Sequence, residues 1–179
     1  LQYLSMSIDR IYREFFGFTL IIFSLFLLGS TLTFSAQDNV VDIIIQDNTY
    51  INNFGYIGAL FSNSIFVNIG LSGFYFCFVI FYFGMLMFFT KPSKELTDKL
   101  SSLNYFLLSL ISIFPLSVFF ASFFQETSLQ ITLAGIPTGG IAGLNLLEII
   151  NESLSLMWIG VLSLILFLSL QYEIGRAHV

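Results

Sequence analysis

The sequence predicts an all-α integral membrane protein with four transmembrane helices, and its composition and long uncharged stretches support this prediction. Of the 179 residues, 56% are apolar and 9% are charged, whereas about a quarter of the residues in a soluble domain carry a charge. A hydrocarbon core is crossed by about 20 apolar residues. Four uncharged stretches reach this length: Phe15–Phe34, Ile65–Thr90, Leu100–Gln125 and Ser153–Tyr172. Because backbone groups in lipid must pair within their own segment, we expect spanning helices at about 15–34, 66–90, 103–124 and 153–172.

The scarcity of basic residues and of cysteines excludes several functions. Six Lys and Arg residues leave no basic surface for nucleic acid, so we expect no direct nucleic-acid contact from this chain. A single cysteine, Cys77, cannot form an intramolecular disulfide or a cysteine-rich metal site. Its neighbours Phe76 and Phe78 predict a packed, unreactive thiol.

The first span follows an N-terminal segment with helical periodicity. Its apolar residues recur at helical spacing: Leu1, Leu4, Ile8, Ile11 and Phe15. This pattern predicts an amphipathic helix that lies along the membrane surface and continues into the span. A secretory signal has an apolar core of about 7–15 residues and small residues at its cleavage site. The run here is longer and ends in Phe34, so we expect the span to be retained.

Orientation follows from the basic residues, which all precede the first span or lie between the second and third, apart from Arg176 in the C-terminal heptapeptide, which we leave out. These topology-determining residues are Arg10, Arg13, Lys91, Lys94 and Lys99. The other two connections carry only acidic charges: Asp38, Asp42, Asp47, Glu126, Glu148 and Glu152. Because Lys and Arg in short loops stay on the cytoplasmic side, we expect both termini in the cytoplasm (N-in/C-in) and both acidic connections outside.

The segment before the second span combines polar and small residues. Gly55 and Ala59 lie four residues apart, as do Gly58 and Ser62, and such a small-residue face lets helices approach closely. The segment is too polar at its start to be a fifth span. We expect an outer interfacial or partly re-entrant helix that bends near Gly70 into the second span.

A glycine-rich segment precedes the fourth span. Gly135–Gly143 contains four glycines and a proline in nine residues, which predicts irregular backbone in an outer loop. At membrane depth such backbone must be covered by protein. The segment lacks the lysine of a nucleotide-binding P-loop, so we expect no phosphate site.

Three polar residues near the fourth span share one face of a predicted helix. Asn145, Glu148 and Glu152 lie at positions i, i+3 and i+7. This stripe is compatible with a divalent-cation site or with a solvated outer face.

Within the spans, two tyrosines and a proline have structural interpretations. Tyr75 and Tyr82 are seven residues apart, so they share a helix face and either pack or hydrogen-bond across the bundle. Pro115 predicts a kink in the third span.

All four spans lack acidic and basic residues. Transporters use such groups inside the membrane as relays, so their absence argues against a transport function.

The C-terminal heptapeptide 173–179 differs abruptly from the leucine-rich span before it. It is similar to a translated sequencing adapter, and we leave it out of functional reasoning. The chain also begins with Leu1 rather than Met. We therefore expect a fragment of a longer protein.

The order of several short motifs among the four spans resembles the N-terminal four-span (4TM) membrane domain of the FtsK/SpoIIIE family of bacterial DNA translocases. The first span closes in Leu32–Asp38, similar to the family's Thr-aromatic-Ser/Thr-x-x-Asp exit. Asn53–Ala59 is similar to its Asn-x-Gly-x-x-Gly-Ala segment, and Gly70 opens the second span. Gly139–Gly143 is similar to its Gly-Gly-x-x-Gly turn. The resemblance covers nearly the whole chain, and it assigns residues 1–172 to such a domain.

The resemblance implies a membrane anchor rather than an enzyme. According to this resemblance, the chain gathers subunits at the division septum and tethers a hexameric, cytoplasmic ATPase through a linker. ATP and magnesium belong to that motor, so no cofactor, metal ligand or catalytic residue is expected in this chain. The implied partners are the lipid bilayer of the bacterial inner membrane, further copies of the chain and cell-division proteins. The helix-packing or assembly candidates are Asn53, Gly55, Gly58, Ala59, Gly70, Gly139, Gly140 and Gly143.

Two other functions stay open at this point. A subunit of a small multi-span transporter or channel predicts a polar path between the spans. A membrane enzyme needs Glu126, Glu148 and Glu152 within hydrogen-bond reach of one another. Neither accounts for the two glycine-bearing segments, for which we predict that the outer segments pack on each other and cap the bundle.

Overall fold

The computed structural model describes residues 2–38, 50–89, 96–124, 136–151 and 153–176. These ranges are helical apart from their connections and contain no strand. The helices are α1 (Gln2–Leu32), α2 (Gly55–Ile69), α3 (Ser72–Phe89), α4 (Leu96–Ile111), α5 (Ile113–Phe124), α7 (Gly140–Asn151) and α8 (Leu156–Arg176).

Within the described ranges, four helical segments are long and apolar enough to cross a membrane, which confirms the predicted number of spans. They are Arg10–Leu32, Ser72–Phe89, Leu103–Phe124 and Leu156–Ile174. The length and composition of these helices therefore indicate a multi-pass membrane protein. Which end faces the cytoplasm stays a prediction.

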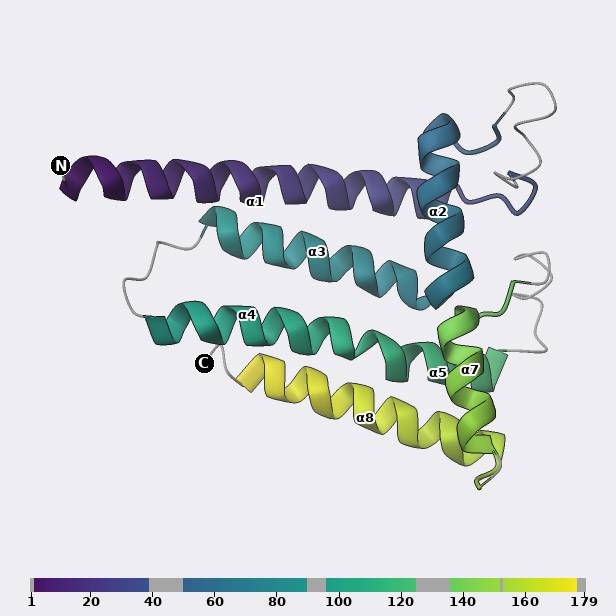
Figure 1. The fold of residues 1–179 in the computed structure, drawn as a ribbon. Coiled ribbons are helices and arrows are strands. Elements are labelled where there is room, and N and C mark those ends of the chain that lie inside the picture. Colours follow the sequence, from purple (N-terminus) through teal and green to yellow (C-terminus); the bar gives the residue numbers. More distant parts are fainter. Residues whose placement is uncertain (1, 39–49, 90–95, 125–135, 152, 177–179) are drawn as a thin grey trace.

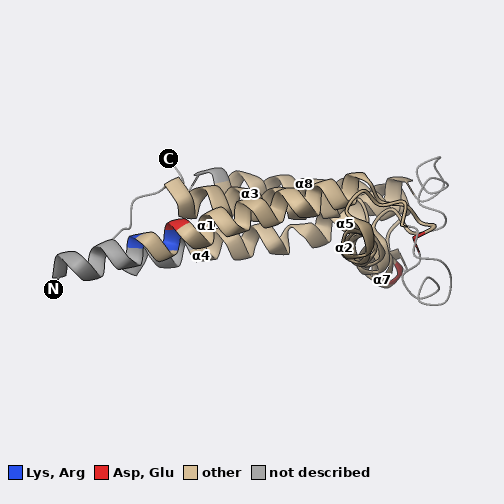
Figure 2. Ribbon diagram, turned by 90° about the horizontal axis from the view of Figure 1, so that it is seen from above, with Lys and Arg blue, Asp and Glu red and all other residues tan. Residues whose placement is uncertain are grey.

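The four spans lie side by side in one layer, in the order α1, α3, α4 with α5, and α8 (Figure 1). Seen from above, this layer is thin (Figure 2). The shorter helices α2 and α7 cross the spans at one end of the layer, opposite both chain termini. The helix predicted before the second span is thus α2, and a second transverse helix, α7, precedes the fourth span (Figure 1). Whether α2 is interfacial or partly re-entrant, and whether it lies on the outer side, stays a prediction.

The second and third spans differ in detail from the prediction. The second span begins at Ser72, because Gly70 adopts φ 60° and ψ −140° and turns the chain, so residues 66–69 belong to α2. The third span is interrupted at Ser112, three residues before Pro115. Because proline lacks an amide hydrogen and its ring crowds the preceding turn, this break matches the expected kink.

The glycine-rich segment before the fourth span is more regular than predicted. Residues 136–139 are irregular, but α7 begins at Gly140, so the expectation of irregular backbone through Gly143 is wrong. Gly140 adopts φ 65°, a conformation that only glycine reaches without strain, and the helix continues from there. The fourth span then begins at Leu156 rather than at residue 153.

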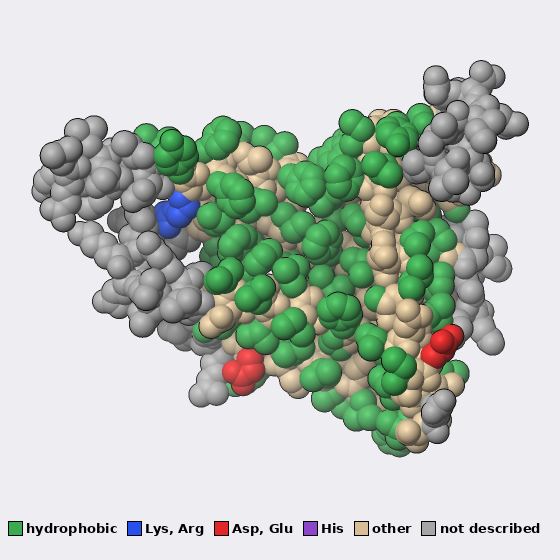
Figure 3. Space-filling model, in the orientation of Figure 1, with side chains coloured by type: hydrophobic (Ala, Val, Ile, Leu, Met, Phe, Trp, Pro, Cys, Tyr) green, Lys and Arg blue, Asp and Glu red, His purple; other side chains and the backbone are tan. Residues whose placement is uncertain are grey.

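Each half of the chain has a core of its own. One cluster joins α1, α2 and α3 through Leu27, Ile65, Cys77 and Ile80. The other joins α5, α7 and α8 through Val118, Ala121, Leu147 and Ile159. Only 17–33% of the residues in the spans are buried, and apolar side chains cover most of the span surface in Figure 3. This surface suits lipid or another protein.

Candidate helix-packing and assembly site

The two transverse helices meet end to end where α2 stops and α7 begins. The Leu71 amide donates a hydrogen bond to the Thr138 carbonyl at 2.7 Å. A Cβ atom at Gly140 would lie 2.5 Å from the backbone of Asn68 and of Ile69, and one at Gly70 would overlap Thr138. This junction therefore requires glycine on both sides.

The start of α7 also packs tightly on the span that precedes it. Cβ atoms at Gly139 and Gly143 would overlap or crowd the Ser117 carbonyl oxygen of α5, the latter at 2.5 Å. The Thr138 hydroxyl donates to the Phe120 carbonyl at 2.8 Å. The predicted candidates Gly139 and Gly143 thus lie at the contact between the start of α7 and α5.

A buried amide holds the start of α2 against the end of α1. The Asn52 side chain is 3% exposed and donates to the carbonyls of Ser30 at 2.9 Å and Thr33 at 3.1 Å. Its carbonyl oxygen accepts from the Phe54 amide at 3.0 Å. A Cβ atom at Gly58 would overlap Asn52 and Phe54, so Gly58 makes room for this amide.

The buried carboxylate of Asp38 supports the same turn. Asp38 is 3% exposed, and its two oxygens accept from the amides of Ile51 and Asn52, each at 2.8 Å. Hydrogen bonds from backbone amides stabilise a charged carboxylate. Asp38 therefore ties the end of the first span to the turn before α2. The sequence analysis noted Asp38 as an outer charge and as the end of the family's exit motif, but it did not predict these hydrogen bonds.

Serines and a tyrosine join the two halves across the layer of spans. The hydroxyls of Ser72 and Ser117, both buried, lie 2.6 Å apart between α3 and α5. Tyr75 of α3 accepts from Ser112 at 3.0 Å and from the Gln171 amide of α8 at 2.7 Å. Hydrogen bonds of this kind hold membrane helices in one register. The structure shows both predicted interactions of Tyr75, since its ring also packs edge-on against Phe167 at a centroid distance of 5.3 Å.

Comparison with known proteins assigns the chain to a family. Residues 9–175 match the family model described as the 4TM region of DNA translocase FtsK/SpoIIIE. This chain belongs to that family. No curated protein and no solved structure matches it. The FtsK/SpoIIIE 4TM region is a non-catalytic membrane domain, and the motor of these translocases is a different domain.

The structure places the family's glycine motifs at two kinds of position. Gly58, Gly139 and Gly143 stand at close contacts within one half of the 4TM region, and Gly70 and Gly140 stand at the junction between halves. The prediction that the two outer segments pack on each other holds for α2 and α7 as helices. The prediction is wrong for the segment Gly55–Ala59, because α7 contacts the opposite end of α2, at Asn68 and Ile69.

Three assembly candidates occupy other positions. Asn53 is exposed, and no described atom lies within 4 Å of a Cβ atom built at Gly55. Ala59 is buried in the first half. Gly55 adopts φ 63°, so it starts α2 in the way that Gly140 starts α7.

Two further glycines in the 4TM region escaped the sequence analysis. A Cβ atom at Gly17 of α1 would lie 2.7 Å from the Phe88 nitrogen and 2.8 Å from the Gly84 carbonyl oxygen of α3. The backbones of these helices therefore touch where the glycines cross. A glycine in an apolar span is a weak signal, because it does not identify its partner.

The charged candidates lie mostly outside the described side chains. Arg10 pairs with Glu14 at 2.6 Å, and Arg10 and Arg13 sit on the part of α1 away from α2 and α7 (Figure 2). The side chains of Lys91, Lys94 and Lys99 are not described, so the predicted topology is not tested by them.

The described residues hold no group of three or more His, Cys, Asp and Glu that could bind a metal. Asn145 and Glu148 are exposed on α7, while Glu126 and Glu152 lie outside the described residues. The proposed convergence of the three glutamates is therefore not tested.

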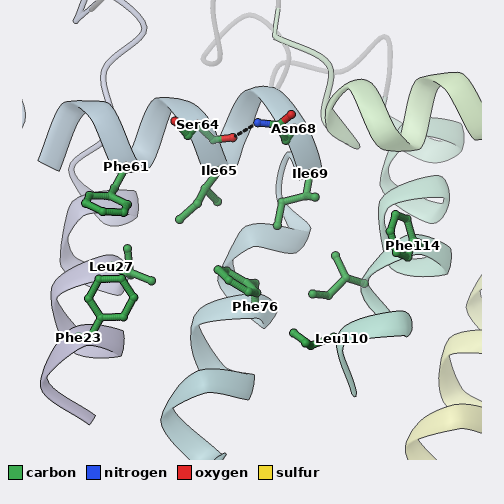
Figure 4. A pocket seen from close by; sticks show the side chains of 11 residues that line it. Phe23, Leu27, Phe61, Ser64, Ile65, Asn68, Ile69, Phe76, Leu110 and Phe114 are labelled. Carbon is green, nitrogen blue, oxygen red and sulfur yellow. Dashed lines mark hydrogen bonds between the residues drawn. The ribbon is translucent and has the colours of Figure 1, made fainter. Parts of the chain in front are cut away.

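An apolar cavity of about 470 Å³ lies under α2, where α1, α3, α4 and α5 converge (Figure 4). Its lining includes Phe23, Leu27, Phe61, Ile65, Ile69, Phe76, Leu110, Ile113 and Phe114. Two lining residues, Ser64 and Asn68, are polar, and the Asn68 side chain donates to the Ser64 carbonyl of its own helix at 2.7 Å. The hollow suits apolar chains rather than ions.

Proposed function

We propose that this chain is the membrane-anchoring and septum-targeting domain of a DNA translocase that acts in cell division and chromosome segregation. It tethers a cytoplasmic ATPase motor to the bacterial inner membrane. It associates with further copies of itself and with cell-division proteins, and it contacts no nucleic acid itself. It binds no cofactor of its own, since ATP and magnesium act in the motor.

The family membership carries this proposal, and the geometry of the spans supports it. Four spans return the chain to the side on which it began. Both termini lie at the end of the layer opposite α2 and α7 (Figure 1). A motor that follows α8 then emerges on the same side as the two arginines of α1, which is the cytoplasmic side by the positive-inside rule.

Reporter fusions test the orientation. A reporter that is active only in the periplasm is fused within 91–99 in one protein and directly after Asn151 in another. We expect activity only from the second fusion. Activity from the first fusion would overturn the orientation and the tether with it.

Fluorescence microscopy of dividing bacteria tests the targeting. We expect a fluorescent fusion of the intact chain to concentrate at the septum. Gly140→Leu, which inserts a side chain into the junction between α2 and α7, should lose this enrichment, whereas Asn145→Leu, at an exposed position of α7, should keep it. Uniform membrane fluorescence of the intact chain would contradict the targeting function.

A transporter or channel subunit is less consistent with the described residues. A conducting path needs polar groups that water or ions reach. The polar side chains between the spans instead bond one another, as Tyr75, Ser112 and Gln171 do, and the cavity is lined mainly by apolar side chains. Solute-flux measurements in vesicles that contain the chain should therefore show no transport.

A further inference from the structure

The two halves of the chain repeat one structural unit. Each unit consists of a span, a connection, a transverse helix and a returning span: α1, α2 and α3 in the first half, and α4 with α5, α7 and α8 in the second (Figure 1). Both units run in the same direction, because neighbouring spans alternate in direction and one span lies between each pair of corresponding spans: α3 between α1 and α4 with α5, and α4 with α5 between α3 and α8 (Figure 1). The chain is thus a tandem pair of parallel repeats.

The turn into each transverse helix is the same in both repeats. The amide of Gly55 donates to the Asn52 carbonyl at 2.9 Å, and the amide of Gly140 donates to the Pro137 carbonyl at 2.8 Å. The φ angles of these glycines are 63° and 65°. Gly58 and Gly143 follow three residues later in their helices. Gly55 and Gly140 are therefore equivalent positions.

These equivalent positions have different surroundings. The start of α7 is covered, because Gly140 lies against Asn68 and Ile69 at the end of α2. At the start of α2, apart from the neighbouring residues and the backbone of α2 itself, no described atom lies within 4 Å of a Cβ atom built at Gly55. The end of α7 is likewise at the edge of the layer (Figure 1). Within one chain, the end of α2 contacts the start of α7. The start of α2 and the end of α7 are the two corresponding ends that lack such a partner.

Both outer ends expose apolar side chains. At the start of α2, Phe54 is 44% and Ile57 is 57% exposed. At the end of α7, Ile149 is 72% exposed, and the following Met157 of α8 is 69% exposed. In a membrane protein such residues suit lipid or the apolar side chains of another protein.

We propose that the end of α7 in one copy of this chain docks on the start of α2 in a second copy. This contact continues the junction that α2 and α7 form within one chain, and it places α8 of one copy beside α1 of the next. The interface is head-to-tail, so each copy uses a different surface from its neighbour and the assembly closes into a ring or extends as a filament.

This inference rests on the self-association included in the proposed function, but not on septum targeting or on DNA translocation. A head-to-tail contact forms equally well in a membrane without a division site. The two proposals therefore have separate tests. Crosslinking tests the contact whether or not the chain is found at the septum, and microscopy tests septum targeting whether or not the contact forms.

Cysteine crosslinking in native membranes tests the contact. Asn53→Cys and Asn151→Cys, two exposed positions at the opposite outer ends, are placed in separate copies that carry different tags. Cys77 is 1% exposed, so the wild-type chain serves as the unreactive control. After mild oxidation we expect a crosslinked dimer that carries both tags. Asn53→Cys paired with Asn145→Cys, at an exposed position in the middle of α7, should crosslink less.

Further variants separate the outcomes. Both cysteines in one chain should give a series of crosslinked oligomers, and Ile149→Asn added to that chain should shorten the series. Dimers of Asn53→Cys alone, without the mixed dimer, would show a two-fold symmetric contact and overturn the proposal. No crosslink from any pair in membranes that contain the folded chain would overturn the proposal as well.

Discussion

The Leu71 amide donates a hydrogen bond to the Thr138 carbonyl at 2.7 Å, and this bond links the end of one transverse helix to the start of the other. Gly70 and Gly140 flank the bond and leave no space for a side chain. The bond joins the two halves of the 4TM region at the end of the spans that lies opposite the chain termini. Because the packing around this bond is tight, replacing single glycines of this region should change the stability of the chain.

Gly140→Ala should destabilise the chain more than Gly55→Ala. Both glycines have positive φ, so each alanine costs roughly 1–2 kcal/mol of backbone strain. Only at Gly140 does the added methyl group also meet backbone, at 2.5 Å. Thermal unfolding of the monomer in detergent measures the difference. Equal losses for the two variants would contradict the junction.

Asn52→Ala should destabilise the chain, whereas Asn53→Ala should leave its stability nearly unchanged. Asn52 is buried and hydrogen-bonds to Ser30 and Thr33, and each buried group left without a partner costs about 1–3 kcal/mol. Asn53 is exposed, and most surface substitutions change stability by less than about 0.5 kcal/mol. Denaturant titration of both variants compares these neighbours, and a larger loss for Asn53→Ala would refute the assignment.

Tyr75→Phe and Gln171→Leu should be energetically coupled. Their side chains share a hydrogen bond of 2.7 Å between α3 and α8, and such bonds between membrane helices average about 0.6 kcal/mol with a maximum near 1.7. A double-mutant cycle on unfolding free energy measures the coupling. Tyr172→Phe, at a position 69% exposed, is the control. Additive losses would mean that the bond contributes nothing.

Gly17→Leu should separate α1 from α3. A Cβ atom at this position would lie 2.7 Å from the Phe88 nitrogen, so the backbones must move apart to accept a side chain. We expect faster proteolysis and a lower unfolding temperature than for Thr19→Leu, on an exposed position of the same helix. Similar behaviour of both variants would argue against the close crossing.

The sequence alone determined the four spans and the presence of a helix before the second span. Both follow from local composition, since the free energy of placing a segment in lipid depends mainly on its own side chains. The break near Pro115 was local in the same way. The boundaries moved by a few residues, because Gly70 and Gly140 turn the chain at points that hydropathy does not mark.

The tertiary structure decided which residues meet. Gly140 was a candidate from its motif, but only the fold placed it on Asn68 and Ile69. Gly17, Ser112 and Gln171 carried no signal, because an apolar span looks alike on its lipid-facing and its packed sides. Close approach and hydrogen-bond pairing depend on two distant segments at once, whereas hydropathy is a property of one.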